Sequence, residues 1–321
     1  FVDQPPRTSG RLQAIGATLD GAVAVLDGNT VDGLRSEVFA TATDFRAVAG
    51  GIRIEGGRAQ LVDNTVNRLT ADNAEDAATA WGFWLGGTRA LLANNRTLRV
   101  NAAGERDAAT SLGVAVRSAA EVFLRRNFIG SGFVNLRTSD AGEAATRGLS
   151  VRDGTAIAGG NVFVGQGTNS RVSGPANATA RAVELAGDAV FVSVGDTLAG
   201  AVTRAPGSGR GLSIALDVVA GRAFVAAAAL VPGESEERVG VRWQAGTVHL
   251  LDDAFVATDV AFGELVRTPA GGLGLEAVND CRGWAEGCGG ATGGNLVVGD
   301  DPFVRATGNV PARDYHLVAG A

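Results

Sequence analysis

The sequence predicts an all-β fold, a right-handed parallel β-helix (solenoid) of about nine turns with roughly 32 residues per turn. Three observations predict it. A step of one small residue, one apolar, one variable and a second apolar residue recurs at intervals of 29 to 35 residues. A glycine turn usually follows the step, and an Asn or Asp returns about 13 residues after nearly every step. The hydrophobic content of 45% is sufficient for one continuous core.

The recurring step predicts the first strand of each coil. The steps begin at Gly16, Gly51, Gly82, Gly113, Gly148, Ala182, Gly211, Gly240 and Gly274. The alternation has a period of two, so both apolar residues of a step lie on one face of the strand and point into the core. We expect these core pairs to include Ile52 and Ile54, Phe83 and Leu85, Val114 and Val116, Leu149 and Val151, and Val241 and Trp243.

The returning amide or acid follows a second strand. These residues are Asn29, Asn64, Asn95, Asn127, Asn161, Asp196 and Asp253, and only the unit that begins at Gly211 lacks one. In a stacked coil each lies above its equivalent, so the amides can hydrogen-bond along the stack. We therefore expect a structural ladder inside the coil.

The last third of each unit is polar and variable in length, which indicates loops along one edge. Helical solenoids are excluded because the recurrent Gly and Asn would destabilise helices. Leucine-rich repeats are excluded because their unit is shorter and rich in Leu, and β-propellers because each unit here has too few residues for a four-stranded blade. We expect one domain, with a lead-in or cap at 1–15, coils at 16–300 and a closing strand at 301–321.

Charge and cysteine content restrict the possible binding partners and the possible cellular location of the protein. The net charge of −6 has no basic stripe, which argues against nucleic acid, and no apolar stretch is long enough for a membrane span. Cys281 and Cys288 are expected to form a local disulfide, with two free thiols as the alternative. A disulfide favours an extracellular or cell-surface location, or the periplasm.

The repeat resembles the pectate-lyase-like superfamily of parallel β-helices. The resemblance rests on the small-apolar-x-apolar step, the turn glycine, and an N-x-apolar step such as Asn64-Thr65-Val66. The segment from Asp301-Pro302-Phe303 to the strand Asp314-Tyr315-His316-Leu317 is similar to the final turn of many bacterial members. The resemblance covers nearly the whole chain and implies the fold, but this architecture carries lyases, hydrolases, epimerases, adhesins and surface proteins.

The catalytic motifs of the enzymes in that superfamily are not recognisable. Hydrolytic members would need an NTD, a DD, a GHG and an RIK step, and here Asn64-Thr65 is followed by Val66 while the last two steps are missing. An inverting hydrolase needs two separated carboxyl groups. A lyase would need calcium-binding carboxylates beside a basic residue. The nearest group is Arg242, His249, Asp252 and Asp253, although Asp253 fits the ladder and His249 faces solvent.

Two other groups are candidate ligand contacts. The acidic loops carry Asp72, Glu75, Asp76, Glu105, Asp107, Asp140 and Glu143 on successive units and could hold Ca²⁺, or they are solvated loops. Trp84 points outward and could stack on a sugar ring, or a neighbouring loop covers it. We expect no other cofactor or metal.

The expected function is a non-enzymatic extracellular or cell-surface structural or binding module. Its expected partners are a polysaccharide, other surface proteins, or a second copy through the coil ends. The alternative is a divergent lyase or glycoside hydrolase that acts on an acidic polysaccharide.

Overall fold

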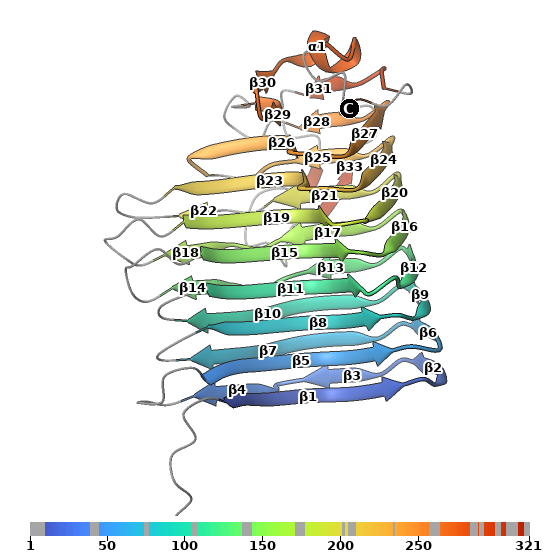
Figure 1. The fold of residues 1–321 in the computed structure, drawn as a ribbon, viewed down its shortest axis with the longest axis vertical. Coiled ribbons are helices and arrows are strands. Elements are labelled where there is room, and N and C mark those ends of the chain that lie inside the picture. The colour runs from blue at the N-terminus through green and yellow to red at the C-terminus, as the bar shows by residue number, and fades with distance from the viewer. Residues whose placement is uncertain are drawn as a thin grey trace, which may run out of the picture.

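The computed structural model confirms the all-β class and shows a parallel β-solenoid with 73% strand and 2% helix. It describes residues 10–38, 45–73, 77–104, 108–136, 143–170, 177–200, 203–204, 210–233, 235–256, 264–282, 288, 292–298, 303–305 and 314–317. In Figure 1 the strands lie above one another, from β1 (Gly10–Asp20) at one end to the short helix α1 (Leu275–Asn279) at the other.

Three sheets form the walls of the solenoid. Sheet A consists of β1, β5 (Phe45–Glu55), β8 (Ala78–Gly86), β11 (Ala108–Arg117), β15 (Glu143–Arg152), β19 (Asn177–Ala186), β23 (Gly211–Val218), β26 (Glu237–Trp243), β29 (Glu264–Thr268) and β30 (Gly271–Leu273). Sheet B consists of β2 (Val23–Asp27), β6 (Arg58–Val62), β9 (Arg89–Ala93), β12 (Glu121–Arg125), β16 (Thr155–Gly159), β20 (Val190–Val194), β24 (Arg222–Ala226) and β27 (Thr247–Leu251).

Sheet C is divided into shorter strands. It contains β3 (Thr30–Asp32), β4 (Arg35–Val38), β7 (Thr65–Asn73), β10 (Arg96–Gly104), β13 (Phe128–Gly130), β14 (Val134–Leu136), β17 (Val162–Gly165), β18 (Thr168–Ser170), β21 (Thr197–Gly200), β22 (Thr203–Arg204), β25 (Ala229–Val231), β28 (Ala254–Val256) and β31 (Leu296–Val298). Strands β32 (Phe303–Arg305) and β33 (Asp314–Leu317), which hold the closing segment, pair antiparallel in a separate two-stranded sheet.

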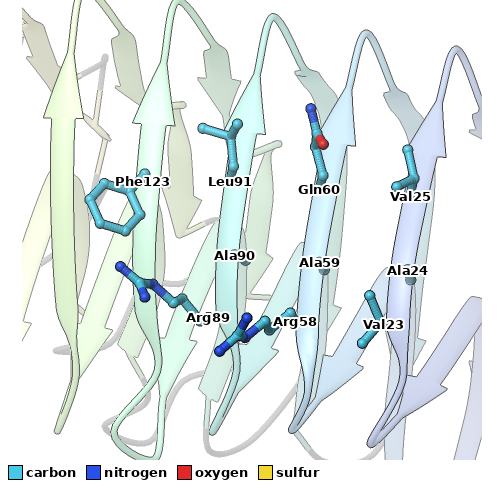
Figure 2. Close-up of a pocket in the computed structure, with 10 residues that line it drawn as sticks. All are labelled: Val23, Ala24, Val25, Arg58, Ala59, Gln60, Arg89, Ala90, Leu91 and Phe123. Atoms are coloured by element: carbon cyan, nitrogen blue, oxygen red, sulfur yellow. The ribbon is translucent and has the colours of Figure 1, made fainter.

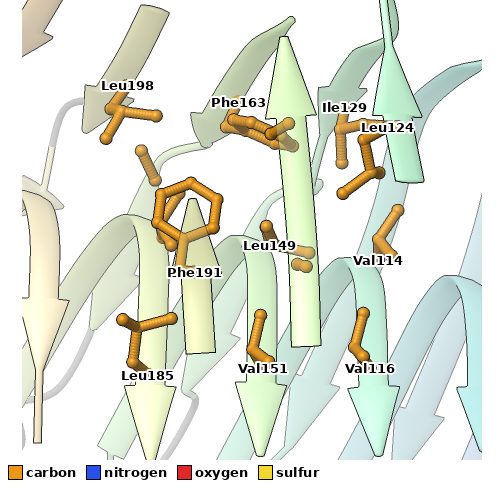
Figure 3. Packing of buried hydrophobic residues seen from close by; sticks show 14 of the residues in the cluster. Val114, Val116, Leu124, Ile129, Leu149, Val151, Phe163, Leu185, Phe191 and Leu198 are labelled. Carbon is orange, nitrogen blue, oxygen red and sulfur yellow. The ribbon is translucent and has the colours of Figure 1, made fainter. Parts of the chain in front are cut away.

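The core lies between the three sheets, as the alternating pattern requires. Both apolar residues of the steps at Gly51, Gly82, Gly113 and Gly148 are buried, Val241 is buried, and Trp243 packs against the core while partly exposed. Figure 3 shows successive coils contributing equivalent residues to continuous columns, with Val114 beside Leu149. The Phe163 and Phe191 rings meet edge to face, with their centroids 6.4 Å apart.

Two sharp corners turn each coil. At the corner between sheets A and B, Gly57 has φ of 67°, and a Cβ there would lie 2.0 Å from the Ala22 carbonyl oxygen. At the corner between sheets B and C, the residue before every ladder position has a positive φ, and these residues are Gly28, Asp63, Asn94, Arg126, Gly160, Gly195, Ala227, Asp252 and Gly294. Gly, Asn and Asp predominate there because they tolerate this conformation best.

The regular solenoid has about five turns of about 33 residues, so the predicted number of about nine turns was too high. Two of the predicted steps at the C-terminal end are also misplaced. The step predicted at Gly211 begins at Ala215 instead, because Leu216 and Val218 pair with the core residues Val183 and Leu185. The coil that follows is shorter, because Asp217 pairs in register with Arg242, only 25 residues further along the chain.

The step predicted at Gly274 begins no strand, because Gly274 is the N-cap of α1. The end of sheet A is closed by the antiparallel pairing of β30 with β29. The side chain of Val278 in α1 is buried in the core. The predicted disulfide between Cys281 and Cys288 is confirmed and lies directly after this helix.

Candidate functional site

A column of charged side chains runs along the outer face of sheet A. Its members occupy the variable position of successive steps, so they alternate with core residues and point outward. The strand register places Ser150 beside Glu184, Glu184 beside Asp217, and Asp217 beside Arg242. A neighbouring column contains Arg147 beside Arg181. Residues 25 to 34 positions apart in sequence are therefore neighbours on this face.

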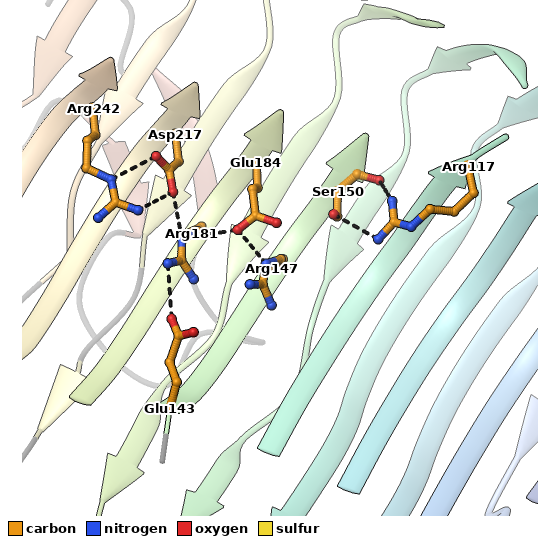
Figure 4. A network of polar contacts seen from close by, with 8 residues as sticks. All are labelled: Arg117, Glu143, Arg147, Ser150, Arg181, Glu184, Asp217 and Arg242. Carbon is orange, nitrogen blue, oxygen red and sulfur yellow. Dashed lines mark hydrogen bonds and ion pairs between the residues drawn. The ribbon is translucent and has the colours of Figure 1, made fainter. Parts of the chain in front are cut away.

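Asp217 is the centre of this network (Figure 4). Its carboxylate accepts hydrogen bonds from Nε of Arg181 at 2.7 Å and from Nε and Nη2 of Arg242 at 2.8 and 2.6 Å. The second pair is bidentate, the arrangement that gives Arg–carboxylate contacts their strength and direction. Asp217 is fully buried, and its charge is balanced by two guanidinium groups.

Arg181 links Asp217 to two further carboxylates. Its Nη2 donates to Glu143 at 3.1 Å, and its Nε lies 3.3 Å from Glu184. Glu184 also forms an ion pair with Arg147 at 2.7 Å. The Arg181 side chain is only 8% exposed, and its Nη1 has no hydrogen-bond partner among the described residues. One buried donor is therefore available.

The arginines fix the ionisation of the carboxyl groups. Burial alone would raise the pKa of Glu143, but Arg181 and Arg147 outweigh burial and lower that pKa below its usual value. Burial would also raise the pKa of Glu237, but Arg267 and Arg210 outweigh burial and lower it below its usual value. Both glutamates are therefore carboxylates at neutral pH.

A cavity of about 340 Å³ opens beside the network. It is lined by Glu143, Asn177, Thr179, Arg181, Arg210, Leu212, Glu237 and Arg242. Arg210 donates to Glu237 at 3.1 Å, and Arg267 donates to the other oxygen of Glu237 at 2.7 Å. Guanidinium donors and carboxylate acceptors therefore both line the cavity wall.

An aromatic cluster occupies the same face nearer the N-terminus. Val48, Trp81, Leu112 and Ala115 are buried there, and Trp84 is partly exposed. The indole of Trp84 donates to Glu55 at 3.0 Å, lies 5.9 Å from Trp81, and is covered by Arg117 at 5.4 Å from its ring. Trp84 thus points outward as expected but is held by neighbouring side chains.

Arg117 joins the aromatic cluster to the charged column. Its Nη1 and Nη2 donate to the carbonyl and hydroxyl oxygens of Ser150 at 2.7 and 3.0 Å. Burial and the nearby Arg152 lower the pKa of Arg117 to about 10.

The structure does not bring the four catalytic candidates together. Arg242 lies in the network of sheet A, whereas His249 lies on the outer face of sheet B. The His249 ring stacks on Phe224 at 3.7 Å, and burial lowers its pKa. Asp252 is an exposed corner residue, and Asp253 is buried inside the coil.

The ladder residues form a continuous series of hydrogen bonds. The Nδ2 of each donates to Oδ1 of the next, from Asn29 through Asn64, Asn95, Asn127 and Asn161 to Asp196, at 2.9 to 3.1 Å. Ala228 occupies the next position, and its N–H donates to Oδ1 of Asp253. Asn295 and Asn279, which were not predicted as ladder residues, continue the series into α1.

The acidic loops are only partly described. Asp72 lies in β7 and Glu143 in β15, whereas Glu75, Asp76, Glu105, Asp107 and Asp140 lie outside the described residues. Within the described residues, no group of three or more His, Cys, Asp or Glu side chains could hold a metal ion.

Sequence reasoning missed the contacts of Arg181, Glu184 and Asp217. The variable positions of successive steps could have revealed these contacts, because aligning the coils in register places those positions side by side. The misplaced step at Gly211 removed Asp217 from that alignment.

No protein family, curated protein or solved structure matches the chain. The described part of the chain contains no helix that is long and apolar enough to cross a bilayer. The fold and the site therefore define a parallel β-solenoid with a charged cavity on one wall.

Proposed function

We propose that this protein is a non-enzymatic binding module of the extracellular space or cell surface, which holds a polysaccharide against the outer face of sheet A. The cavity beside the network is the observation that carries the proposal. Sugar hydroxyls both donate and accept hydrogen bonds, which matches a wall that contains both guanidinium and carboxylate groups. The buried Nη1 of Arg181 supplies a free donor at that wall.

The balance of charge favours a neutral polysaccharide. Three arginines line the cavity, and three carboxylates, those of Glu143, Glu237 and the underlying Asp217, neutralise them. A uronic acid polymer would find no excess positive charge to compensate its carboxylates.

The ionisation of the cavity supports binding over catalysis. Glycoside hydrolysis requires one carboxyl group that stays protonated to act as the general acid. The pKa values of Glu143 and Glu237 are both lowered, so neither carries a proton at neutral pH. Asp217 is fully engaged by Arg181 and Arg242 and has no oxygen free for a calcium ion.

The location and the family are part of the same proposal. The Cys281–Cys288 disulfide supports an oxidising compartment. The repeated steps support a divergent member of the pectate-lyase-like superfamily that has kept the coil without the catalytic motifs of its enzymes.

The test measures binding and turnover on one polysaccharide panel. Neutral and acidic polymers are titrated by calorimetry, and the same mixtures are assayed for unsaturated products and reducing ends with and without Ca²⁺. We expect binding of a neutral polymer without turnover. Arg210→Gln, at the exposed rim, should weaken binding by about tenfold, since a charge-assisted hydrogen bond is lost.

Arg282→Gln is the matched control, because Arg282 is an exposed ion-paired arginine that does not line the cavity. Turnover that depends on the cavity residues would instead establish the divergent lyase or hydrolase. Absence of binding to every polymer would refute the binding role.

A further inference from the structure

The outer face of sheet B is unusually apolar for a solvent-facing wall. A sheet with one face on the core normally presents polar side chains on the other. Here one outward column is apolar at six of its eight positions, and Val25 is 68% and Phe224 46% exposed. The apolar members of this column are Val25, Leu91, Phe123, Ile157, Val192 and Phe224.

The first four strands of this face form a groove of about 390 Å³ (Figure 2). Ala59 and Ala90 lie along its floor. Leu91 and Phe123 stand on one side, and Arg58 and Arg89 stand on the other. A mainly apolar lining with a few polar groups, in a volume of roughly 300 to 1,000 Å³, is typical of small-molecule sites.

The two arginines lie side by side on neighbouring strands. Arg58 and Arg89 are paired in register, so their like charges repel one another. Arg89 contacts Glu121 at 3.4 Å and lies over the Phe123 ring. The Arg58 side chain has no hydrogen bond or ion pair with any described residue. An anion bound between the two guanidinium groups would relieve this repulsion.

The charge of the face also excludes a second copy of the same face. The strands of sheet B carry four arginines, Arg58, Arg89, Arg125 and Arg222, and two acids, Asp27 and Glu121. Face-to-face association would bring an excess of like charge together. The occupant must therefore be anionic, and the apolar wall requires that it also be apolar along its length.

We propose that this groove binds a free medium-chain aliphatic carboxylate, with the carboxylate between Arg58 and Arg89 and the chain along Leu91 and Phe123. The site lies on a different sheet from the cavity of the proposed function and does not depend on it. The chain gains burial against the apolar wall, and each oxygen gains a charge-assisted hydrogen bond.

The test is calorimetric titration of the full chain with decanoate below its micelle concentration. We expect one saturable site. The double variant Arg58→Gln/Arg89→Gln should weaken binding by more than about tenfold, and Leu91→Asn should weaken it while leaving both arginines in place. All three side chains are at the surface, so these variants should fold, which circular dichroism checks.

Arg222→Gln is the matched control, because Arg222 is an exposed arginine in the same row of sheet B outside the groove. It should leave decanoate affinity unchanged. Decyltrimethylammonium should not bind. Absence of decanoate binding, equal binding of the cationic amphiphile, or an equal loss in Arg222→Gln would overturn the proposal. Binding only to phosphatidylglycerol vesicles would overturn it too, because it would indicate a membrane surface as the partner.

Discussion

At the scale of single residues, the ladder contains two kinds of side chain. Its amides both donate and accept hydrogen bonds, whereas its ionised acids only accept them. Asn161 donates to Asp196, and the other oxygen of Asp196 accepts from Ser193. Asp253 is less well satisfied, because one oxygen accepts from Ala228 and the other has no partner among the described residues. Burial therefore raises the pKa of Asp253 to about 7.

This pKa predicts a stability that depends on pH. The folded state binds a proton at Asp253 more tightly than the unfolded state, so stability falls as pH rises from the usual carboxyl range to about 7 and levels off above it. Asp253→Asn should remove this dependence and stabilise the protein by up to about 4 kcal/mol at pH 8, with no gain at pH 4. Urea unfolding at both pH values measures it. Asp252→Asn, at the exposed neighbour, should show no such gain.

The ladder also predicts a gradient of stability along the stack. The amide of Asn95 donates to Leu61, Ala93 and Asn127 and accepts from Asn64 within the core. Asn95→Ala should cost about 2–4 kcal/mol, because several buried groups lose their partners. Asn29→Ala, at the exposed first coil, should cost less than about 1 kcal/mol. Equal losses in urea unfolding would contradict a structural ladder.

At the scale of elements, the sequence predicted the strands wherever the step has one unambiguous start. The inward pairs at Ile52, Phe83 and Val114 were right because period-two alternation has only one buried face. The step at Gly211 was wrong because two overlapping patterns, from Gly211 and from Ala215, fit equally well, and only the contact with β19 decides between them. The charged network was not predicted for the same reason.

The network predicts a strong asymmetry between buried and exposed ion pairs. Asp217→Asn should cost about 3–5 kcal/mol, because Arg181 and Arg242 would keep their charges without a counter-ion. Glu276→Gln, which removes one of the two acidic partners of the exposed Arg282, should cost at most about 1 kcal/mol. Similar losses for the two variants in denaturant unfolding would argue against a buried network.

At the scale of the whole molecule, one end of the solenoid is closed by named elements. Strand β30 runs antiparallel to β29, α1 buries Val278, and the Cys281–Cys288 disulfide follows the helix. Stacked coils contact only their neighbours, so stability is distributed unevenly along the axis. The sequence identified the disulfide but not the helix, because Gly274 imitates another step.

This closure predicts the order in which the molecule opens. The double variant Cys281→Ser/Cys288→Ser should lose about 2 kcal/mol of local stability. Hydrogen exchange should rise first in α1 and β29, while β8, β11 and β15 stay protected. A uniform rise across sheet A would mean that the cap does not unfold separately from the coils.

In the ladder each Asn donates to the equivalent residue of the next coil, and this uniform direction has a consequence for how such a chain evolves. Asn64, Asn95 and Asn127 each donate through Nδ2 to the Oδ1 of the next ladder residue. A gene segment that encodes one coil between them is therefore an interchangeable module. Its duplication or deletion leaves every ladder amide with an acceptor. The segment from Asp196 to Asp253 lacks this property, since acids flank an alanine. The rod can therefore change its length by whole coils on its N-terminal side, while the C-terminal side is constrained.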